Sequence, residues 1–105
     1  MKYRILLLAV LIASTITAAA QTFTLKGRVI DEDNNPVEFA SVSCLAQGKA
    51  TVTSLKGEYR LTLTSADSVV IRFSMLGYRT KTRVLHRPRG PQTLQVVLQG
   101  ASKEL

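Results

Sequence analysis

Few side chains in this sequence have the types and spacing that catalysis or metal binding requires. The chain contains one histidine, His86, and one cysteine, Cys44. A histidine-based metal site needs several ligands, and nucleophilic catalysis needs a nucleophile beside a base. Neither set can be assembled from the motifs present, and no pair of carboxylates is placed as in a cleft. We therefore expect no catalytic residue, no metal ligand, no cofactor and no enzymatic activity.

The densest group of oxygen-bearing side chains is the segment DEDNNP, residues 31–36. Its carboxylates and amides are ligand types that calcium prefers, but the spacing lacks the distant bidentate carboxylate of an EF-hand loop. Aspartate and asparagine also favour turns, and Pro36 cannot continue a strand's hydrogen-bond ladder. The sequence favours a turn between two strands over a calcium site.

Cys44 has no partner with which to form an internal disulfide. It alternates with Ala40 and Val42, so on a strand the three side chains share one face. This pattern predicts a buried thiol that acts as a small hydrophobic residue, with a reactive or metal-binding thiol as the alternative.

The first twenty residues have the pattern of a secretory signal peptide. Lys2 and Arg4 precede the apolar run at residues 5–13, and three alanines at residues 18–20 offer a cleavage site before Gln21. A retained membrane anchor is the alternative, but the run is far shorter than the roughly 20 residues that span a bilayer. Cleavage would leave 12 basic and 7 acidic residues, a net charge of +5.

Basic residues gather in the second half of the chain, where no acidic residue lies between Asp67 and Glu104. Nucleic acid is not an expected partner after export. Three of the cations alternate with Thr80, Thr82 and Val84, which predicts that they share one exposed strand face able to contact an acidic partner. The alternative is a solvated edge strand kept soluble by its charges. The three cations are Arg79, Lys81 and Arg83, and the further basic residues are Arg72, Arg87 and Arg89.

The elements that must position these residues have a period of two and are separated by turn residues, which is typical of antiparallel strands. Seven short strands are expected, each with about half of its side chains facing inward. Two sheets can then pack face to face, so the sequence predicts an all-β, seven-stranded antiparallel sandwich. The expected strands are residues 23–31, 37–46, 50–54, 58–63, 68–76, 78–85 and 92–99.

Three stretches together resemble the carboxypeptidase regulatory-like domain, a transthyretin-like (prealbumin-like) sandwich: GRVIDEDNNPVEFASV, ATVTSLKGEYRLTL and VVIRFSMLGYRTKTRVL. The resemblance covers nearly the whole chain after Gln21. Ser54 stands where the family usually has aspartate and Ala50 where it often has glycine, so weaker hydrogen bonding is expected in the turn at Gly57. The matching positions are Gly27, Val29, Asp31, Pro36, Val37, Ala40, Val42, Thr53, Gly57, Tyr59, Leu61, Gly77 and Tyr78.

The pair Gly77 and Tyr78 follows an alternating apolar strand, and its residue types indicate a structural corner. Glycine allows the backbone to bend, and the tyrosine ring can cover the end of the core while its hydroxyl stays near water. A ligand-stacking role for Tyr78 is the alternative. Six residues are thus expected to be structural: Gly27, Pro36, Gly57, Tyr59, Gly77 and Tyr78.

The resemblance implies a function through the order of segments. A signal peptide followed directly by such a domain is typical of SusC-type TonB-dependent outer-membrane transporters, in which the domain is a periplasmic N-terminal extension. The expected partners are then the receptor's plug and barrel and the TonB machinery. In this interpretation residues 1–20 are the signal peptide, 21–99 the domain, and 100–105 a tail leading to a downstream segment.

A second interpretation is a free-standing secreted, periplasmic or cell-surface module that binds glycan or surface polymer. The sequence contains no tryptophan, and most of its tyrosines and phenylalanines fall at expected inward positions. A platform of exposed aromatic residues for sugar stacking is therefore not indicated.

The signal-peptide pattern predicts that the exported protein begins at Gln21. N-terminal sequencing or intact mass of the exported chain will check this prediction. Recovery of the uncleaved chain from membranes would contradict it.

Overall fold

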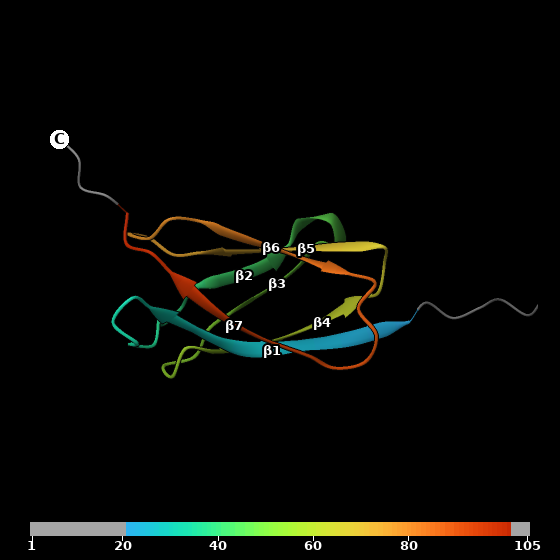
Figure 1. Cartoon of the computed structure of the whole chain (residues 1–105), viewed down its shortest axis with the longest axis horizontal. Helices are drawn as coiled ribbons and strands as arrows, with labels where there is room; N and C mark the ends of the chain where they lie inside the picture. Colours follow the sequence, from blue (N-terminus) through green and yellow to red (C-terminus); the bar gives the residue numbers. More distant parts are fainter. Residues whose placement is uncertain (1–20, 102–105) are drawn as a thin grey trace, which may run out of the picture.

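The computed structural model describes residues 21–101, which fold as the expected sandwich of two β-sheets (Figure 1). The predicted signal peptide, residues 1–20, and residues 102–105 of the predicted tail lie outside the described residues. Within residues 21–101, one sheet has the strand order β4-β1-β7 and the other β3-β2-β5-β6. The strands are β1 (Thr22–Asp31), β2 (Ser41–Cys44), β3 (Lys49–Val52), β4 (Glu58–Thr64), β5 (Ser68–Ser74), β6 (Lys81–His86) and β7 (Gln92–Leu98), with a short 3-10 helix, η1 (Leu45–Gln47).

The core lies between the sheets and follows the alternation of the sequence. In β4 and β5 every second side chain is buried, which confirms the expected inward faces. Cys44 is buried beside Ala40 and Val42, so the prediction of a buried thiol is confirmed. The core residues are Phe23, Leu25, Val29, Val37, Ala40, Val42, Cys44, Tyr59, Leu61, Leu63, Val69, Ile71, Phe73, Val96 and Leu98.

One pairing corrects the prediction of wholly antiparallel sheets. The first strand, β1, pairs with the last, β7, in parallel, from Leu25 opposite Gln92 to Asp31 opposite Leu98. The chain therefore enters the sandwich at one end and leaves it at the other (Figure 1). Alternation within a strand sets which face a residue occupies, but not the direction of the neighbouring strand, so the sequence pattern did not reveal this pairing.

Gly27 makes it possible for three strands to pack closely. It lies between Tyr59 of β4 and Leu94 of β7. The Tyr59 ring passes beneath Gly27 and its hydroxyl donates a 2.6 Å hydrogen bond to the Leu94 carbonyl. A Cβ atom at position 27 would overlap that carbonyl oxygen and lie 2.9 Å from the tyrosine oxygen. Only glycine leaves the room for this contact.

The segment DEDNNP forms the expected turn. One carboxylate oxygen of Asp31 accepts 2.9 Å hydrogen bonds from the backbone N–H groups of Asp33 and Asn35. Asn34 has a positive φ of 69°, a conformation that asparagine tolerates. Pro36 then forms a single β-bridge with Ile30.

Gly57 lies directly against this turn. Its φ is 75°, and a Cβ atom there would lie 2.5 Å from the Val29 carbonyl oxygen. The Ser54 hydroxyl accepts hydrogen bonds from the backbone N–H groups of Lys56 and Glu58 at 3.3 and 3.2 Å. These lengths are at the long end for N–H···O bonds. The backbone bonds of the same turn, from the Gly57 N–H to the Ser54 carbonyl and from the Ser54 N–H to the Glu58 carbonyl, are 2.9 Å. The weaker turn expected where serine replaces aspartate therefore stays a prediction.

Gly77 and Tyr78 form the expected corner. Gly77 has a φ of 89°, and the Tyr78 N–H donates to the Met75 carbonyl at 3.0 Å. Tyr78 is half-buried against the core and bridges to Gly100. The chain then runs beside residues 99–101 before β6 begins at Lys81, so this strand starts three residues later than the sequence pattern suggested.

Among residues 21–101, no helix is long and apolar enough to cross a membrane.

We predict that Gly27→Ala lowers the free energy of unfolding by about 3 kcal/mol or more, because the new methyl group overlaps the backbone of β7. Gly100→Ala is the control, since nothing lies within 4 Å of a Cβ atom there, and it should cost less than about 0.5 kcal/mol. Urea unfolding of both variants measures the difference. Equal stability of the two variants would contradict the close contact at Gly27.

Candidate binding site

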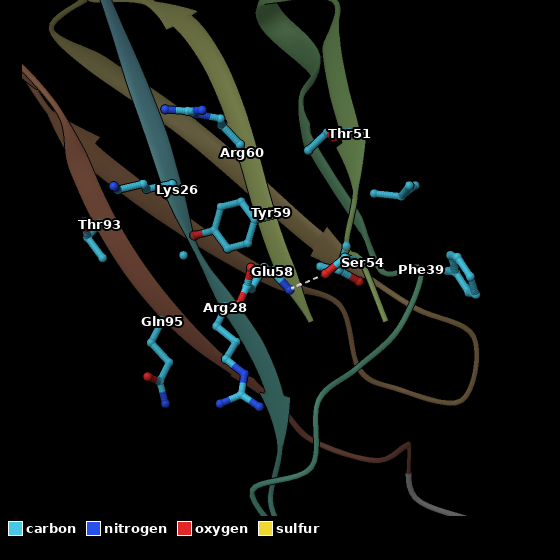
Figure 2. A pocket seen from close by; sticks show the side chains of 13 residues that line it. Lys26, Arg28, Phe39, Thr51, Ser54, Glu58, Tyr59, Arg60, Thr93 and Gln95 are labelled. Atoms are coloured by element: carbon cyan, nitrogen blue, oxygen red, sulfur yellow. Dashed lines mark hydrogen bonds between the residues drawn. The ribbon is translucent and has the colours of Figure 1, made fainter. Parts of the chain in front are cut away.

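A groove of about 890 Å³ lies over the outer face of the β4-β1-β7 sheet (Figure 2). Its floor and one side carry polar and charged side chains from β1, β4 and β7, and its other side is formed by residues of β3 and the loop before β2. We call it the outer-sheet groove. The residues that line it and are used below are Lys26, Arg28, Arg60, Thr93, Gln95, Glu58, Phe39 and Val52.

Two of the three cations in the outer-sheet groove face each other across neighbouring strands. Lys26 lies directly opposite Arg60, and Arg28 opposite Glu58. All four side chains are exposed. Within residues 21–101 the structure contains one ion pair, between Arg87 and Asp67, and both of these residues lie outside the groove. None of the four side chains is therefore ion-paired within the described residues. Like charges directly opposite in a sheet destabilise it, so the Lys26–Arg60 pair is locally unfavourable unless an anion lies between the two cations.

The apolar side of the groove is built around Phe39. This side chain is 60% exposed and its backbone has a φ of 56°. A bulky residue rarely adopts this conformation, which costs of order 1–3 kcal/mol and persists only where the surroundings impose it. Val52, 58% exposed, lies on the same side of the groove.

Thr53 imposes that conformation on the loop. Among residues 21–101 it is the only polar residue that is buried, with 1% of its surface exposed. Its hydroxyl donates to the Val37 carbonyl at 2.6 Å and accepts from the Ala40 N–H at 2.8 Å. Its carbonyl also accepts from the Phe39 N–H at 3.1 Å. The loop is therefore held on both sides of Phe39, which keeps the aromatic ring at the surface.

Beneath the floor of the groove, the Tyr59 side chain is buried and its hydroxyl bonds to the Leu94 carbonyl. Burial raises the pKa of the Tyr59 hydroxyl to about 12, because the charged phenolate would be poorly solvated there. Tyr59 also packs edge-on against Phe73 of the opposite sheet, with ring centroids 5.5 Å apart. Thr93 and Gln95 expose a hydroxyl and an amide beside it (Figure 2). The floor thus presents a hydroxyl, an amide and charged groups, which can form hydrogen bonds and ion pairs with a ligand.

The structure corrects the prediction that Arg79, Lys81 and Arg83 form one exposed face. Arg79 precedes β6, and its N–H donates to the Gln99 carbonyl. Lys81 lies opposite the buried Phe73, is half-buried, and donates from its ammonium to the Val97 carbonyl at 3.1 Å. Arg83 lies on the same inward side but is exposed. Inward-pointing charges of this kind protect an edge strand from pairing with another chain.

Sequence reasoning missed the outer-sheet groove, although one signal was present. Lys26 and Arg28 alternate along the expected outer face of β1, and Arg60 does so on β4. The sequence did not reveal that β1 and β4 are neighbours. Their pairing register is what places Lys26 opposite Arg60. The position of Phe39 carried no signal, because alternation suggested an ordinary strand residue.

The other chemistry-bearing residues remain apart. His86 ends β6 and is exposed. Among residues 21–101, no three histidine, cysteine or acidic side chains converge on a point where they could hold a metal ion.

The sandwich and its polar groove define a module that binds or connects other molecules. Residues 25–105 match the family model described as the CarboxypepD_reg-like domain, and the chain belongs to this family. Domains of this family are regulatory, non-catalytic sandwiches. A comparison with curated proteins gave no match.

Solved structures share the fold at low sequence identity. A chain of a type II cohesin–X-dockerin complex from Acetivibrio cellulolyticus is 12% identical with a TM-score of 0.64, and the match covers 74% of this chain and 58% of that one. Catechol 1,2-dioxygenase from Pseudomonas arvilla C-1 is 15% identical with a TM-score of 0.61, covering 85% and 55%. This chain thus spans little more than half the length of those chains. At such identities the likeness concerns the fold alone.

We predict that Tyr59→Phe lowers the free energy of unfolding by about 1–3 kcal/mol at neutral pH, because the Leu94 carbonyl loses its hydrogen-bond donor. The advantage of the wild type should shrink above pH 10. Below that pH the phenol is protonated in both states, so the full contribution is present. As the pH rises from 10.0 toward 12, the unfolded chain releases the proton first and stability is lost.

Urea unfolding of both proteins between pH 8 and pH 12 measures this convergence. A constant difference across that range would show that Tyr59 is not shielded from water as the structure indicates.

Proposed function

We propose that this domain is a non-catalytic, periplasmic N-terminal extension of a TonB-dependent outer-membrane transporter, and that it acts through protein–protein contact. Its place would be the periplasmic side of the outer membrane. Its partners would be the transporter's plug and barrel and the energy-transducing TonB machinery.

The parallel pairing of β1 with β7 is the observation that carries this proposal. Because the first and last strands run in the same direction, residues 21 and 101 lie at opposite ends of the sandwich (Figure 1). A domain of this topology can be placed in line within a longer chain, as an extension requires. A free-standing binding module has no need for this arrangement, and the ends of many domains lie close together.

Two further features support the proposal. The signal-peptide pattern stops at Ala20, and β1 begins at Thr22, so the sandwich would follow export directly. The segment after β7 is anchored to the corner by the Ala101 N–H, which donates to the Gly77 carbonyl at 2.8 Å. The end of the described chain is therefore held against the corner at Gly77.

Contact rather than transport is the role that the domain's surface supports. The outer-sheet groove offers charge and an exposed aromatic ring, while β6 is protected against strand pairing by Lys81 and Arg83. A specific contact is thus directed to the outer face of the β4-β1-β7 sheet. Arg79 and Arg83 are available for additional contacts at the edge.

To test this proposal, an epitope can be inserted after Gly90, which is exposed in a loop with nothing within 4 Å of a Cβ position. We predict that the tagged protein, expressed from its own gene, fractionates with the outer membrane as a product much larger than the domain. Protease should digest the epitope only after the outer membrane is permeabilised. Immunoblots of cell fractions, with one periplasmic and one surface marker as controls, measure both properties.

A small tagged product in the periplasm or medium would instead favour the free-standing module. Digestion of the epitope in intact cells would contradict a periplasmic position.

A further inference from the structure

We infer that the outer-sheet groove binds an extended acidic peptide segment, whose carboxylates contact Lys26, Arg28 and Arg60 and whose apolar side chain packs on Phe39. The inference deepens the protein-contact role proposed above by naming the surface and the chemistry of the partner. It concerns binding in solution, so it can succeed or fail independently of where the domain resides in the cell.

Charge selects the class of ligand. The groove contains three cations and one carboxylate, Glu58. Arg28 uses its Nε–H to bond the Lys56 carbonyl at 3.0 Å, which fixes the arginine in place and leaves its terminal nitrogens to donate. Guanidinium groups match carboxylates in bidentate geometry. A carboxylate placed between Lys26 and Arg60 would also relieve the repulsion of that cross-strand pair.

The apolar side indicates that the ligand is more than a simple anion. Figure 2 shows Phe39 on the side of the groove away from Thr93 and Gln95, with the cations of β1 and β4 between them. A ligand that fills the groove must therefore present charge at its centre and an apolar group toward Phe39. The strained backbone at Phe39 supports this assignment, since the Thr53 hydrogen bonds that hold it keep an aromatic ring in water.

An extended peptide fits both requirements. Its alternating side chains can place carboxylates and apolar groups at a regular spacing, and its backbone can bond the exposed hydroxyl and amide of Thr93 and Gln95. The volume of about 890 Å³ is in the range of ligand-binding clefts.

The test uses the exported chain and a fluorescently labelled peptide in which glutamate alternates with leucine. A matched peptide with glutamine in place of glutamate is the ligand control. Fluorescence anisotropy should show binding of the glutamate peptide that weakens as salt is raised, since exposed charges are screened by ions. In NMR spectra the backbone amides of Lys26, Arg60 and Gln95 should shift.

The key variant replaces the three cations of the groove: Lys26→Gln, Arg28→Gln and Arg60→Gln. Its control removes one lysine and two arginines elsewhere: Lys49→Gln, Arg72→Gln and Arg89→Gln, all at exposed positions. The groove variant should weaken binding by about tenfold or more, and the control by less than about threefold. Both sets of side chains are exposed, so circular dichroism and urea unfolding should show folded proteins.

Phe39→Asn separates binding from folding. Asparagine tolerates a positive φ better than phenylalanine, so this variant should be at least as stable as the wild type. It should nevertheless bind the peptide about threefold or more weakly, because the apolar contact is lost.

Three results would overturn the inference. One is equal loss of affinity in the groove and control variants, which would indicate non-specific attraction to a basic protein. Another is equal binding of the glutamine peptide. The third is tighter binding of inorganic phosphate or of vesicles containing phosphatidylglycerol, competitive with the peptide, which would assign the groove to a phosphate group or a lipid surface.

Discussion

The hydrogen bond from Tyr59 to the Leu94 carbonyl is the constraint on which the rest of the structure depends. It joins β4 to β7 across the central strand β1, and it exists only because Gly27 has no side chain to separate them. The same tyrosine ring contacts Phe73 in the opposite sheet. One residue therefore fixes the spacing of three strands and the packing of the two sheets, and a buried hydroxyl with a single defined acceptor specifies one register over its alternatives.

The hydrogen bond from Tyr59 holds β7 beside β1, with which it pairs in parallel. This pairing places the two ends of the described chain at opposite ends of the sandwich. The two ends of a domain often lie close together, whereas here residues 21 and 101 lie at opposite ends of the sandwich. Force applied along the chain would pull β1 and β7 in opposite directions along their shared ladder, so it would load the ladder's hydrogen bonds together rather than one by one. This topology is the basis of the in-line position proposed above.

The surface is divided between protection and recognition. On β6, Lys81 and Arg83 point to the inward side of an edge strand, and Lys81 bonds to β7, which hinders pairing with other chains. The outer-sheet groove instead contains two locally unfavourable features. Lys26 lies opposite another cation, Arg60, and Phe39 has a strained backbone and an exposed side chain. Proteins often keep such unfavourable residues at functional surfaces, where the rest of the fold compensates for their cost. The shared fold of cohesin complexes and dioxygenases shows how many uses this sandwich supports, so function has to be argued from such a surface.

The sequence by itself determined the class of the fold, the buried faces of β4 and β5, and the family. Alternation in β4 and β5 is enough to place their core residues, because the side chains of a strand point to opposite faces in turn. Turn chemistry likewise predicted the segment after Asp31 and the corner at Gly77, since both depend on local backbone preferences. Only the tertiary structure decided which strands are neighbours. The parallel β1–β7 pair, the inward position of Lys81 and the meeting of Lys26 with Arg60 all follow from pairing between residues far apart in the chain. Such contacts are set by the packing of the whole core, and the period of a single strand contains no information about them.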